Sequence, residues 1–366
     1  GDKGLLVAEE EREKGAVSSQ IYWVYVRSWG AAYHVFVVAV LFVVSEAVND
    51  GTDVWLAVWS ANTYVAPGNT TVGAVGGTTP APSHPAIEGS MGFWLGVYAA
   101  FTVGAVVSTA GRGCYFQTRG IHASRTMFRA LVRSVLRGRM EFFDTTPSGR
   151  VLNRFSRDTD TLDTQLATMS ENYGTVSLGV LGAMVVVCIF LPYFTIPFVP
   201  IAIVYKFTEG YFTPTARDLN RLTSITRSPM LSNFSEMLAG LVTIRAFGLS
   251  RAFEARSIDL LDQNMRPQLT NMEARRWLDV RLELLNGMIQ FFTALFCIQL
   301  REAVSPQYAG MCMAKALAVG QFLGLLVMFR GQMEAAMNCV ERIDHYTRAV
   351  PPELSVLDAP APGADP

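Results

Sequence analysis

Six runs of mostly uncharged, apolar residues alternate with polar stretches along this 366-residue chain. An α-helix rises 1.5 Å per residue, so about 20 residues cross a hydrocarbon core about 30 Å thick. The pattern therefore predicts an all-α membrane protein with six transmembrane helices. The runs lie at residues 30–48, 92–111, 172–191, 194–212, 284–300 and 311–329. The fourth run is the most interrupted, by Pro197, Pro200, Lys206 and Glu209.

Two long polar stretches, of about 60 and about 70 residues, follow the second and the fourth run. Their helical periodicity predicts that each stretch leaves the membrane and returns as a pair of helices projecting roughly 40 Å. The turn of the first pair is predicted at residues 144–158, and that of the second at residues 224–230. Both turns would then lie far from the bilayer.

The first turn has its own amphipathic pattern. Pro147 and Gly149 favour a tight turn, and a short helix is predicted to follow them. Its apolar positions at i, i+1 and i+4 form one predicted face, and arginines occupy the remaining surface. The apolar positions are Val151, Leu152 and Phe155, and the arginines are Arg150, Arg154 and Arg157. Such a helix, far from the membrane, is typical of a surface offered to a partner.

The charges are distributed very unevenly. Residues 49–91 contain no lysine or arginine, whereas residues 112–157 and 217–281 contain ten arginines each. The positive-inside rule places both basic stretches, and hence both ends of the chain, in the cytoplasm. Asn69 begins a glycosylation sequon in the first outer loop, while the sequon at Asn233 would face the cytoplasm and stay unmodified. The arginine stripe Arg125, Arg129, Arg133 and Arg137 is expected to be a solvated helix face, and not a nucleic-acid site.

The composition supports a membrane protein, because half of the residues are apolar and only 17% are charged. Five unclustered cysteines, mostly within apolar runs, indicate buried thiols and no metal or redox centre. The G-x-x-x-x-G-K-[ST] phosphate-binding motif does not occur in the sequence. We therefore expect neither catalytic residues nor a bound cofactor in this chain.

The two ends differ from the predicted transmembrane domain at residues 29–349. Residues 1–28 are polar and then weakly amphipathic, which predicts an elbow helix at the cytoplasmic membrane surface. Residues 350–366 are rich in alanine, proline and aspartate and are predicted to form a linker towards a further domain beyond Pro366.

Several separated motifs now carry a family likeness. They lie at residues 10–25, 142–150, 152–156, 227–229, 240–247, 277–283 and 340–343. In this order and spacing they closely resemble the second transmembrane domain of ATP-binding-cassette (ABC) exporters of the multidrug-resistance-associated (C) subfamily. The likeness implies the type IV ABC exporter fold, with six helices that have long cytoplasmic extensions. It also implies transport by alternating access, in a plasma membrane or an internal vesicle or vacuole membrane.

By this resemblance, the two turns are coupling helices that contact nucleotide-binding domains. Those domains lie outside the chain and would bind ATP and magnesium, so the parent protein is expected to be an ATP-hydrolysing translocase. The first transmembrane domain of the parent is a further implied partner. The implied contact residues are Ser148, Gly149, Arg150, Leu152, Asn153, Arg154 and Phe155 in the first turn, with Arg227, Ser228 and Pro229 in the second.

The best candidates for substrate contact lie in the fifth run and just before it. Trp277 and Arg281 share a helix face, and Asn286 and Gln290 follow deeper in the membrane. Spacing alone leaves two interpretations open: a cargo site, or an interfacial tryptophan anchor beside an arginine paired with Glu283. In the family, the tryptophan and arginine at these positions contact organic anions, which favours the cargo site.

The chain departs from the family's anion-binding members at two positions. Arg275 replaces an asparagine, and Gly210 replaces an arginine of the fourth span, with Lys206 one turn away. The predicted cargo is therefore an amphipathic organic anion, a drug or a thiol conjugate, with specificity for glutathione conjugates in doubt. A channel or channel regulator of the same subfamily is the alternative.

Overall fold

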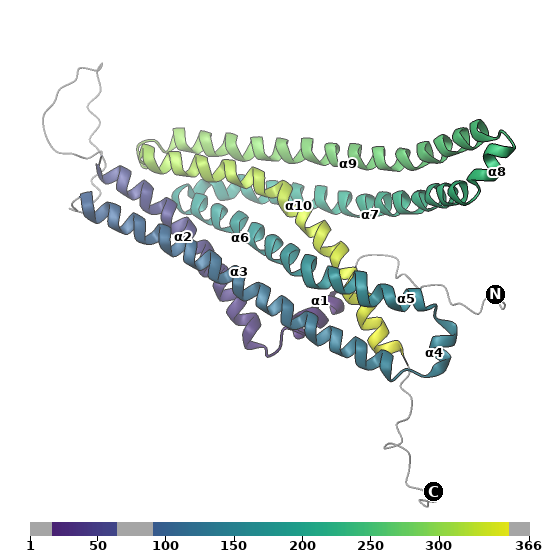
Figure 1. Cartoon of the computed structure of the whole chain (residues 1–366). Coiled ribbons are helices and arrows are strands. Elements are labelled where there is room, and N and C mark those ends of the chain that lie inside the picture. The colour runs from purple at the N-terminus through teal and green to yellow at the C-terminus, as the bar shows by residue number, and fades with distance from the viewer. Residues whose placement is uncertain (1–16, 64–90, 351–366) are drawn as a thin grey trace, which may run out of the picture. The chain divides into compact units, whose positions relative to one another are not determined.

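The computed structural model describes residues 17–63 and 91–350, and these residues form helices without β-strands (Figure 1). Most of the predicted elbow at residues 1–28, the sequon at Asn69, and nearly all of the predicted linker at residues 350–366 lie outside the described residues. The described helices are α1 (Ser19–Arg27), α2 (Tyr33–Thr63), α3 (Met91–Leu136), α4 (Met140–Thr145), α5 (Ser148–Asn153), η1 (Arg154–Asp158), η2 (Thr161–Leu166), α6 (Ala167–Phe190), η3 (Pro192–Phe194), α7 (Thr195–Ala239), α8 (Leu241–Ala246), α9 (Ser250–Gln299) and α10 (Pro306–Ala349).

Five of the described helical segments are long and apolar enough to cross a membrane. They are Tyr33–Asn62, Met91–Leu136, Ser148–Phe190, Ser250–Gln299 and Pro306–Arg348. They contain the predicted first, second, third, fifth and sixth runs. The predicted fourth run lies in α7, where Lys206, Glu209 and prolines lower the hydropathy and a long polar extension follows.

The chain divides into two compact units, whose boundaries fall within α6 and α10. The first unit, up to Gly182 and from Leu325 onward, is built around a core of residues from α1, α2, α3, η2 and α10. Trp29 and Phe42 each place a ring edge against Phe116 of α3, with centroids 5.2 and 5.7 Å apart. A side chain at Gly120 would lie 2.6 Å from Cβ of Ala167, so glycine permits the close approach of α3 to α6.

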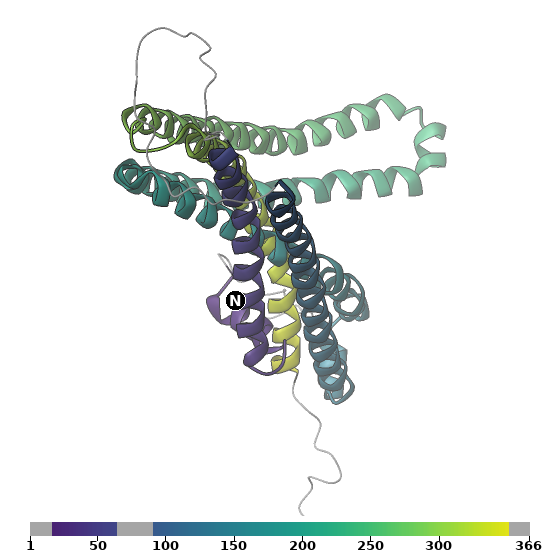
Figure 2. The ribbon, with the colours of Figure 1, turned by 90° about the vertical axis from the view of Figure 1, so that its left-hand side faces the viewer.

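The second unit, Ala183–Gly324, contains a long hairpin in which α7 and α9 run side by side and α8 closes the far end (Figures 1 and 2). Asparagine side chains bridge the two helices along this polar extension. Asn264 Nδ2 donates to Thr223 O at 2.9 Å, and Asn271 Nδ2 donates to Asn220 Oδ1 at 2.8 Å. Because such bonds satisfy polar groups between the helices, the hairpin holds together with little apolar core.

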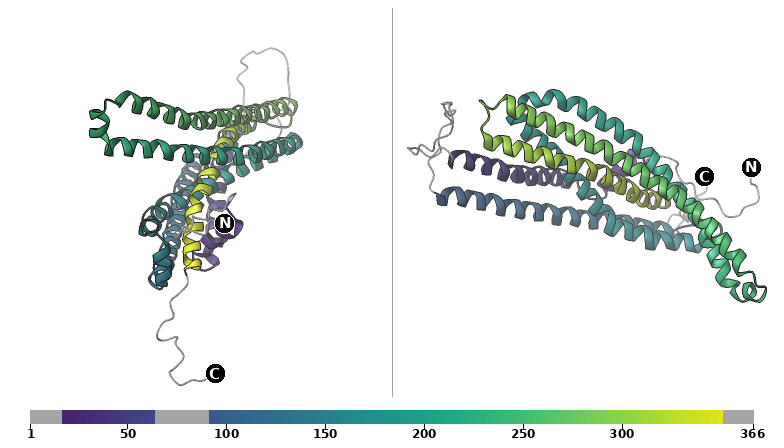
Figure 3. Two further views of the ribbon diagram at one scale, coloured as in Figure 1. Left: turned by 90° about the vertical axis from the view of Figure 1, so that its right-hand side faces the viewer. Right: turned by 90° about the horizontal axis from the view of Figure 1, so that it is seen from above.

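The predicted second turn is wrong in its position. Residues 224–230 lie inside α7, and the chain reverses about ten residues later, at Gly240–Leu249 (Figure 3). Pro229 is accommodated within α7, as are Pro200 and Pro214. At the actual turn, Gly248 adopts φ +67°, in the left-handed region that favours glycine.

The cysteine prediction is only partly right. Cys312 and Cys339 are buried, whereas Cys188 and Cys297 are half-buried and Cys114 on α3 is exposed. All five thiols are free.

Candidate functional site

The first predicted turn is built from α4, α5 and η1, as the sequence predicts for residues 144–158 (Figure 1). Ser148, Gly149, Leu152 and Asn153 are exposed on it, and the Leu152 side chain is 66% exposed. Proline at position 147 precedes α5, and the amides of Arg150 and Val151 donate to its carbonyl. The turn thus offers a small, partly apolar surface to its surroundings.

Arg154 is placed differently from the prediction, which put it on the outer surface. Its side chain is buried, and its Nη1 donates to Asp158 Oδ2 at 2.7 Å. Arg154 follows Val151 by three residues and precedes Phe155, so helical spacing puts it on the same face as both, whereas Leu152 is rotated away from that face. The prediction placed Arg154 outside because of its charge, but its ion pair with Asp158 allows it to be buried. Residues Arg154–Asp158 form a π-helix.

The buried carboxylate of Asp158 also meets α10. Arg342 Nε donates to Asp158 Oδ2 at 3.0 Å, and Arg342 Nη2 donates to Asp158 Oδ1. This two-pronged contact is the geometry in which arginine binds a carboxylate most strongly. Arg154 also lies over the ring of Tyr346, with Cζ 5.3 Å from the centroid. The first turn is therefore fixed to the end of α10 by charge as well as by packing.

Aromatic contacts complete this junction. Phe155, a predicted contact residue that is half-buried, places its ring 5.9 Å from Phe128 of α3. Phe142 of α4 packs edge-on against Tyr346, with centroids 6.0 Å apart. Ser134 Oγ of α3 donates to the carbonyls of Tyr346 and Thr347, both at 3.2 Å.

The second turn presents apolar side chains at its tip. Val242 and Phe247 are 82% and 74% exposed, and Leu241 and Leu249 are also exposed. Ile244 is the buried residue of α8 and holds it against the hairpin end. The tip therefore has the surface expected of a docking element, although the residues predicted for it lie elsewhere.

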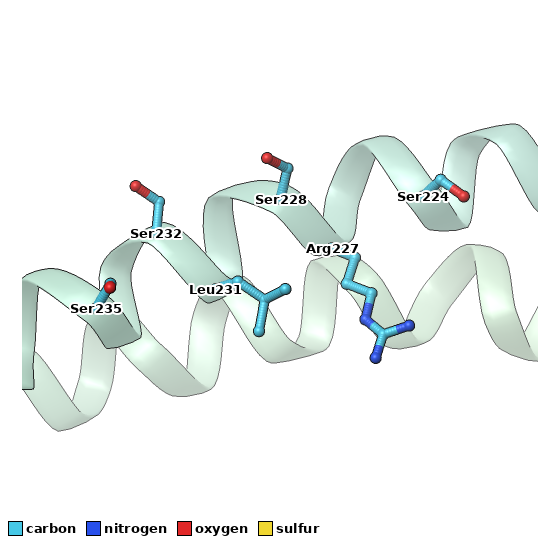
Figure 4. Close-up of a pocket in the computed structure, with 6 residues that line it drawn as sticks. All are labelled: Ser224, Arg227, Ser228, Leu231, Ser232 and Ser235. Atoms are coloured by element: carbon cyan, nitrogen blue, oxygen red, sulfur yellow. The ribbon is translucent and has the colours of Figure 1, made fainter. Parts of the chain in front are cut away.

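Those residues, Arg227, Ser228 and Pro229, belong to the side of α7. Ser224, Arg227, Ser228, Leu231, Ser232 and Ser235 line a shallow depression of about 550 Å³. Figure 4 shows the hydroxyls of Ser228 and Ser232 on one side of the helix and Arg227 and Leu231 on another. The small serine side chains form a polar stripe along α7, at a distance from the turn that ends the hairpin.

In the second unit, Arg281 and Trp277 form the arrangement expected from their spacing on α9. The guanidinium Cζ lies 3.7 Å from the centre of the Trp277 rings, and Arg281 Nη1 donates to the Trp277 carbonyl at 3.2 Å. Tyr211 of α7 lies beside Trp277, with ring centroids 5.6 Å apart and the ring planes tilted by 39°. Tyr211 was not among the predicted contact residues, although it lies next to Gly210 in the fourth run.

The remaining candidates are distributed along the same unit. Gln290 Nε2 donates to Asn286 Oδ1 at 3.1 Å, while Asn286 is buried against Gly320 of α10. A Cβ at position 320 would lie 1.9 Å from Asn286 Cγ, so the asparagine fills the space that glycine leaves. This contact shows that Asn286 packs two helices together.

Lys206 and Arg275, the two other basic residues predicted to contact cargo, have different surroundings. Lys206 Nζ lies 3.1 Å from Glu209 Oε2, and the lysine is exposed while the glutamate is buried. Arg275 is exposed on α9. Glu209 was predicted only as an interruption of the fourth run, but in the structure it offsets the charge of Lys206.

Helices long and apolar enough to cross a membrane, with long polar extensions that end in two turns, are the arrangement expected of the membrane part of a transporter. The family model for the "ABC transporter transmembrane region" matches residues 35–329, and the chain belongs to this family. It is accordingly an integral, multi-pass membrane protein with a role in transport.

The relatives refine this membership. The chain is 32% identical to ABC transporter C family member 12 of Dictyostelium discoideum, over 99% of this chain and 26% of the relative. It is 32% identical to human ATP-binding cassette sub-family C member 2, over 94% of this chain and 21% of the relative. It is 31% identical to multidrug resistance protein fer6 of Mycosarcoma maydis, over 95% of this chain and 24% of the relative. These matches confirm the predicted resemblance to the C subfamily, and the chain spans about a quarter of the length of these relatives.

Proposed function

We propose that the chain is the second transmembrane domain of an ATP-driven exporter of the C subfamily, with a type IV fold of six helices. The fourth span would be residues 194–212, within α7. Residues 1–28 would form the elbow, residues 350–366 would lead to a nucleotide-binding domain, and both ends would be cytoplasmic. Family membership supports this proposal, together with the two exposed turns.

The observation that carries the cargo proposal is the stack of Arg281 on Trp277. The guanidinium of Arg281 is planar, and its N–H groups beyond the one that donates to the Trp277 carbonyl would bind a carboxylate or sulfonate. Trp277 and Tyr211 add flat apolar surface beside this positive charge. A flat apolar group joined to an anion fits this combination, so the cargo would be an amphipathic organic anion, a drug or a thiol conjugate.

The other candidates contribute less positive charge than their number suggests. Glu209 offsets Lys206, and Asn286 is occupied with Gly320 and Gln290. Arg281 would then be the main cationic group beside Trp277, because Arg275, six residues earlier on α9, lies on another face of the helix. The site is therefore proposed to bind singly charged amphipathic anions better than multiply charged ones.

Coupling between ATP hydrolysis and transport would depend on two surfaces of this chain. The nucleotide-binding domains outside this chain would hold ATP and magnesium, while this chain supplies the exposed residues of α5 and α8 as contacts. Ser148, Gly149, Leu152 and Asn153 remain the proposed contacts of the first turn. Arg150, Arg154 and Phe155 would shape that turn from within, because they are buried or half-buried. In the second turn, Val242 and Phe247 replace Arg227, Ser228 and Pro229 as proposed contacts.

The test uses inside-out vesicles from cells that express the full-length parent, with a fluorescent singly charged amphipathic anion as the probe. ATP-dependent, saturable uptake is expected. Arg281→Ala should raise the half-saturating concentration by roughly tenfold to a hundredfold, the effect of losing a hydrogen bond to a charged group.

Arg266→Ala is the matched control, because Arg266 is an exposed arginine of the same helix. It should leave the half-saturating concentration unchanged. A voltage-dependent current without accumulation of the probe would instead favour the channel alternative, and equal effects of the two substitutions would overturn the cargo assignment.

A further inference from the structure

The Asp158 carboxylate joins segments of the first unit that are far apart in the sequence. The side chain is 2% exposed, although it belongs to a polar turn. Arg154, four residues earlier, and Arg342, 184 residues later, both donate to it. One buried acid therefore links the first cytoplasmic turn to α10.

A gain in folding stability does not by itself explain why the ion pairs of Asp158 are buried. Removing charges from water is costly, and well-packed apolar residues often hold a core equally well or better. What ion pairs add is a fixed geometry, because the planar guanidinium of Arg342 meets both carboxylate oxygens. Tyr346, one turn beyond Arg342, lies under Arg154 and against Phe142, so the last turns of α10 are held at several points.

The segment that carries Asp158 is also unusual in its backbone. Two short π-helices, Arg154–Asp158 and Thr161–Leu166, interrupt the helix that continues into α6. A return to α-helical bonding would rotate the residues beyond it, since π-segments take up an extra residue relative to an α-helix. Asp158 ends the first of these segments, where its ion pairs can fix the rotation of the turn relative to α10.

We propose that Asp158 is a positioning residue for transport: it makes the first cytoplasmic turn and the end of α10 move as one body. The proposal rests on the proposed function, in which a nucleotide-binding domain displaces this turn. A displacement of the turn would then reach α10 directly through Arg342, and not only through the helices adjoining the turn. Asp158 and Arg342 would determine how much cargo moves for each ATP hydrolysed.

The first experiment measures transport and ATP hydrolysis on the purified, full-length parent in proteoliposomes. Asp158→Asn should lower the cargo moved per ATP by roughly two- to thirtyfold, the range for residues that carry coupling without touching a ligand. Arg342→Lys keeps the charge and loses the two-pronged geometry, so its loss should be smaller. If Asp158→Asn folds poorly, Arg342→Lys still tests the proposal. The ratio of cargo moved to ATP hydrolysed does not depend on the amount of folded protein.

Two matched controls lie close by. Asp160→Asn removes an exposed carboxylate two residues away, and Arg348→Lys alters an exposed pair with Asp344 on the same helix as Arg342. Both should leave the ratio unchanged. Equal loss in Asp160→Asn and Asp158→Asn would overturn the proposal, and so would an unchanged ratio in both Asp158→Asn and Arg342→Lys.

A second experiment needs no cargo. Spin labels at the exposed positions Ser156 and His345, in a cysteine-depleted background, report the separation between the turn and α10. The separation should be the same with and without trapped nucleotide, and Asp158→Asn should broaden or shift it. A separation that changes with nucleotide in the unsubstituted protein would refute the single-body proposal. Absence of ATP-dependent uptake by the unsubstituted protein would refute the proposed function instead, and the distance measurement would still decide the role of Asp158.

Discussion

Replacing Val242 and Phe247 together by serine should uncouple the α8 tip from its partner while leaving the fold intact. The two side chains are 82% and 74% exposed, so they contribute little to the packing of this chain. Fully burying such a side chain is worth about 1.5–3 kcal/mol, and most of that gain is still available to each. Allowing for non-additivity, we expect a loss of at least about 2 kcal/mol in docking, or roughly 30-fold in affinity.

The assay compares cargo-stimulated ATP hydrolysis with thermal unfolding of the full-length protein in proteoliposomes. Stimulation should fall steeply, while the unfolding temperature should change little because surface substitutions usually cost less than about 0.5 kcal/mol. Leu269→Ser is the control, since Leu269 is 59% exposed but lies midway along α9. Normal stimulation in the double variant, or the same loss in Leu269→Ser, would refute the assignment of α8 as the second docking element.

Three further predictions concern other parts of the chain. Gly320→Ala should lower the unfolding temperature, at a cost of about 1–3 kcal/mol, because a Cβ there collides with Asn286; adding Asn286→Ala should recover part of this loss. Enzymatic deglycosylation should shift the gel mobility of the parent in a way that Asn69→Gln abolishes, and no shift should depend on Asn233, whose Nδ2 donates to Ser257 Oγ at 2.9 Å in a buried site. Leu152→Asp should weaken coupling without unfolding the protein, and unchanged transport per ATP in that variant would contradict a docking role for the first turn.

The helical fold could be predicted from the sequence because its signals are local. Apolar runs of sufficient length and the 3.6-residue period placed the long helices, and Pro147 with Gly149 placed the first turn. The second turn was misplaced because Pro229 in a serine-rich stretch resembles a turn. In the structure that proline lies inside α7, and Gly240 and Gly248 were the informative residues.

The side-chain network of the first unit could not be predicted in this way. Arg154 and Asp158 are four residues apart, which in an α-helix would suggest an exposed pair. Their burial depends on Arg342, which pairs with Asp158 across 184 residues and which entered the sequence prediction only within the motif at residues 340–343. Long-range pairing of this kind leaves no periodic signal. The same limitation applies to Asn286, whose packing depends on the absence of a side chain at Gly320.

The first turn buries charged groups and exposes an apolar one, and the second turn exposes apolar groups at its tip. Arg154 and Asp158 are buried beneath the first turn, while Leu152 on that turn and Val242 and Phe247 on the second turn are exposed. Water favours the reverse arrangement, because burying charge is costly and exposing apolar area forgoes a gain. The arrangement is favourable when apolar partners cover the tips and the buried charges fix the orientation of the turn beneath them. For this reason we regard the two turns as halves of interfaces whose other halves lie on domains outside this chain.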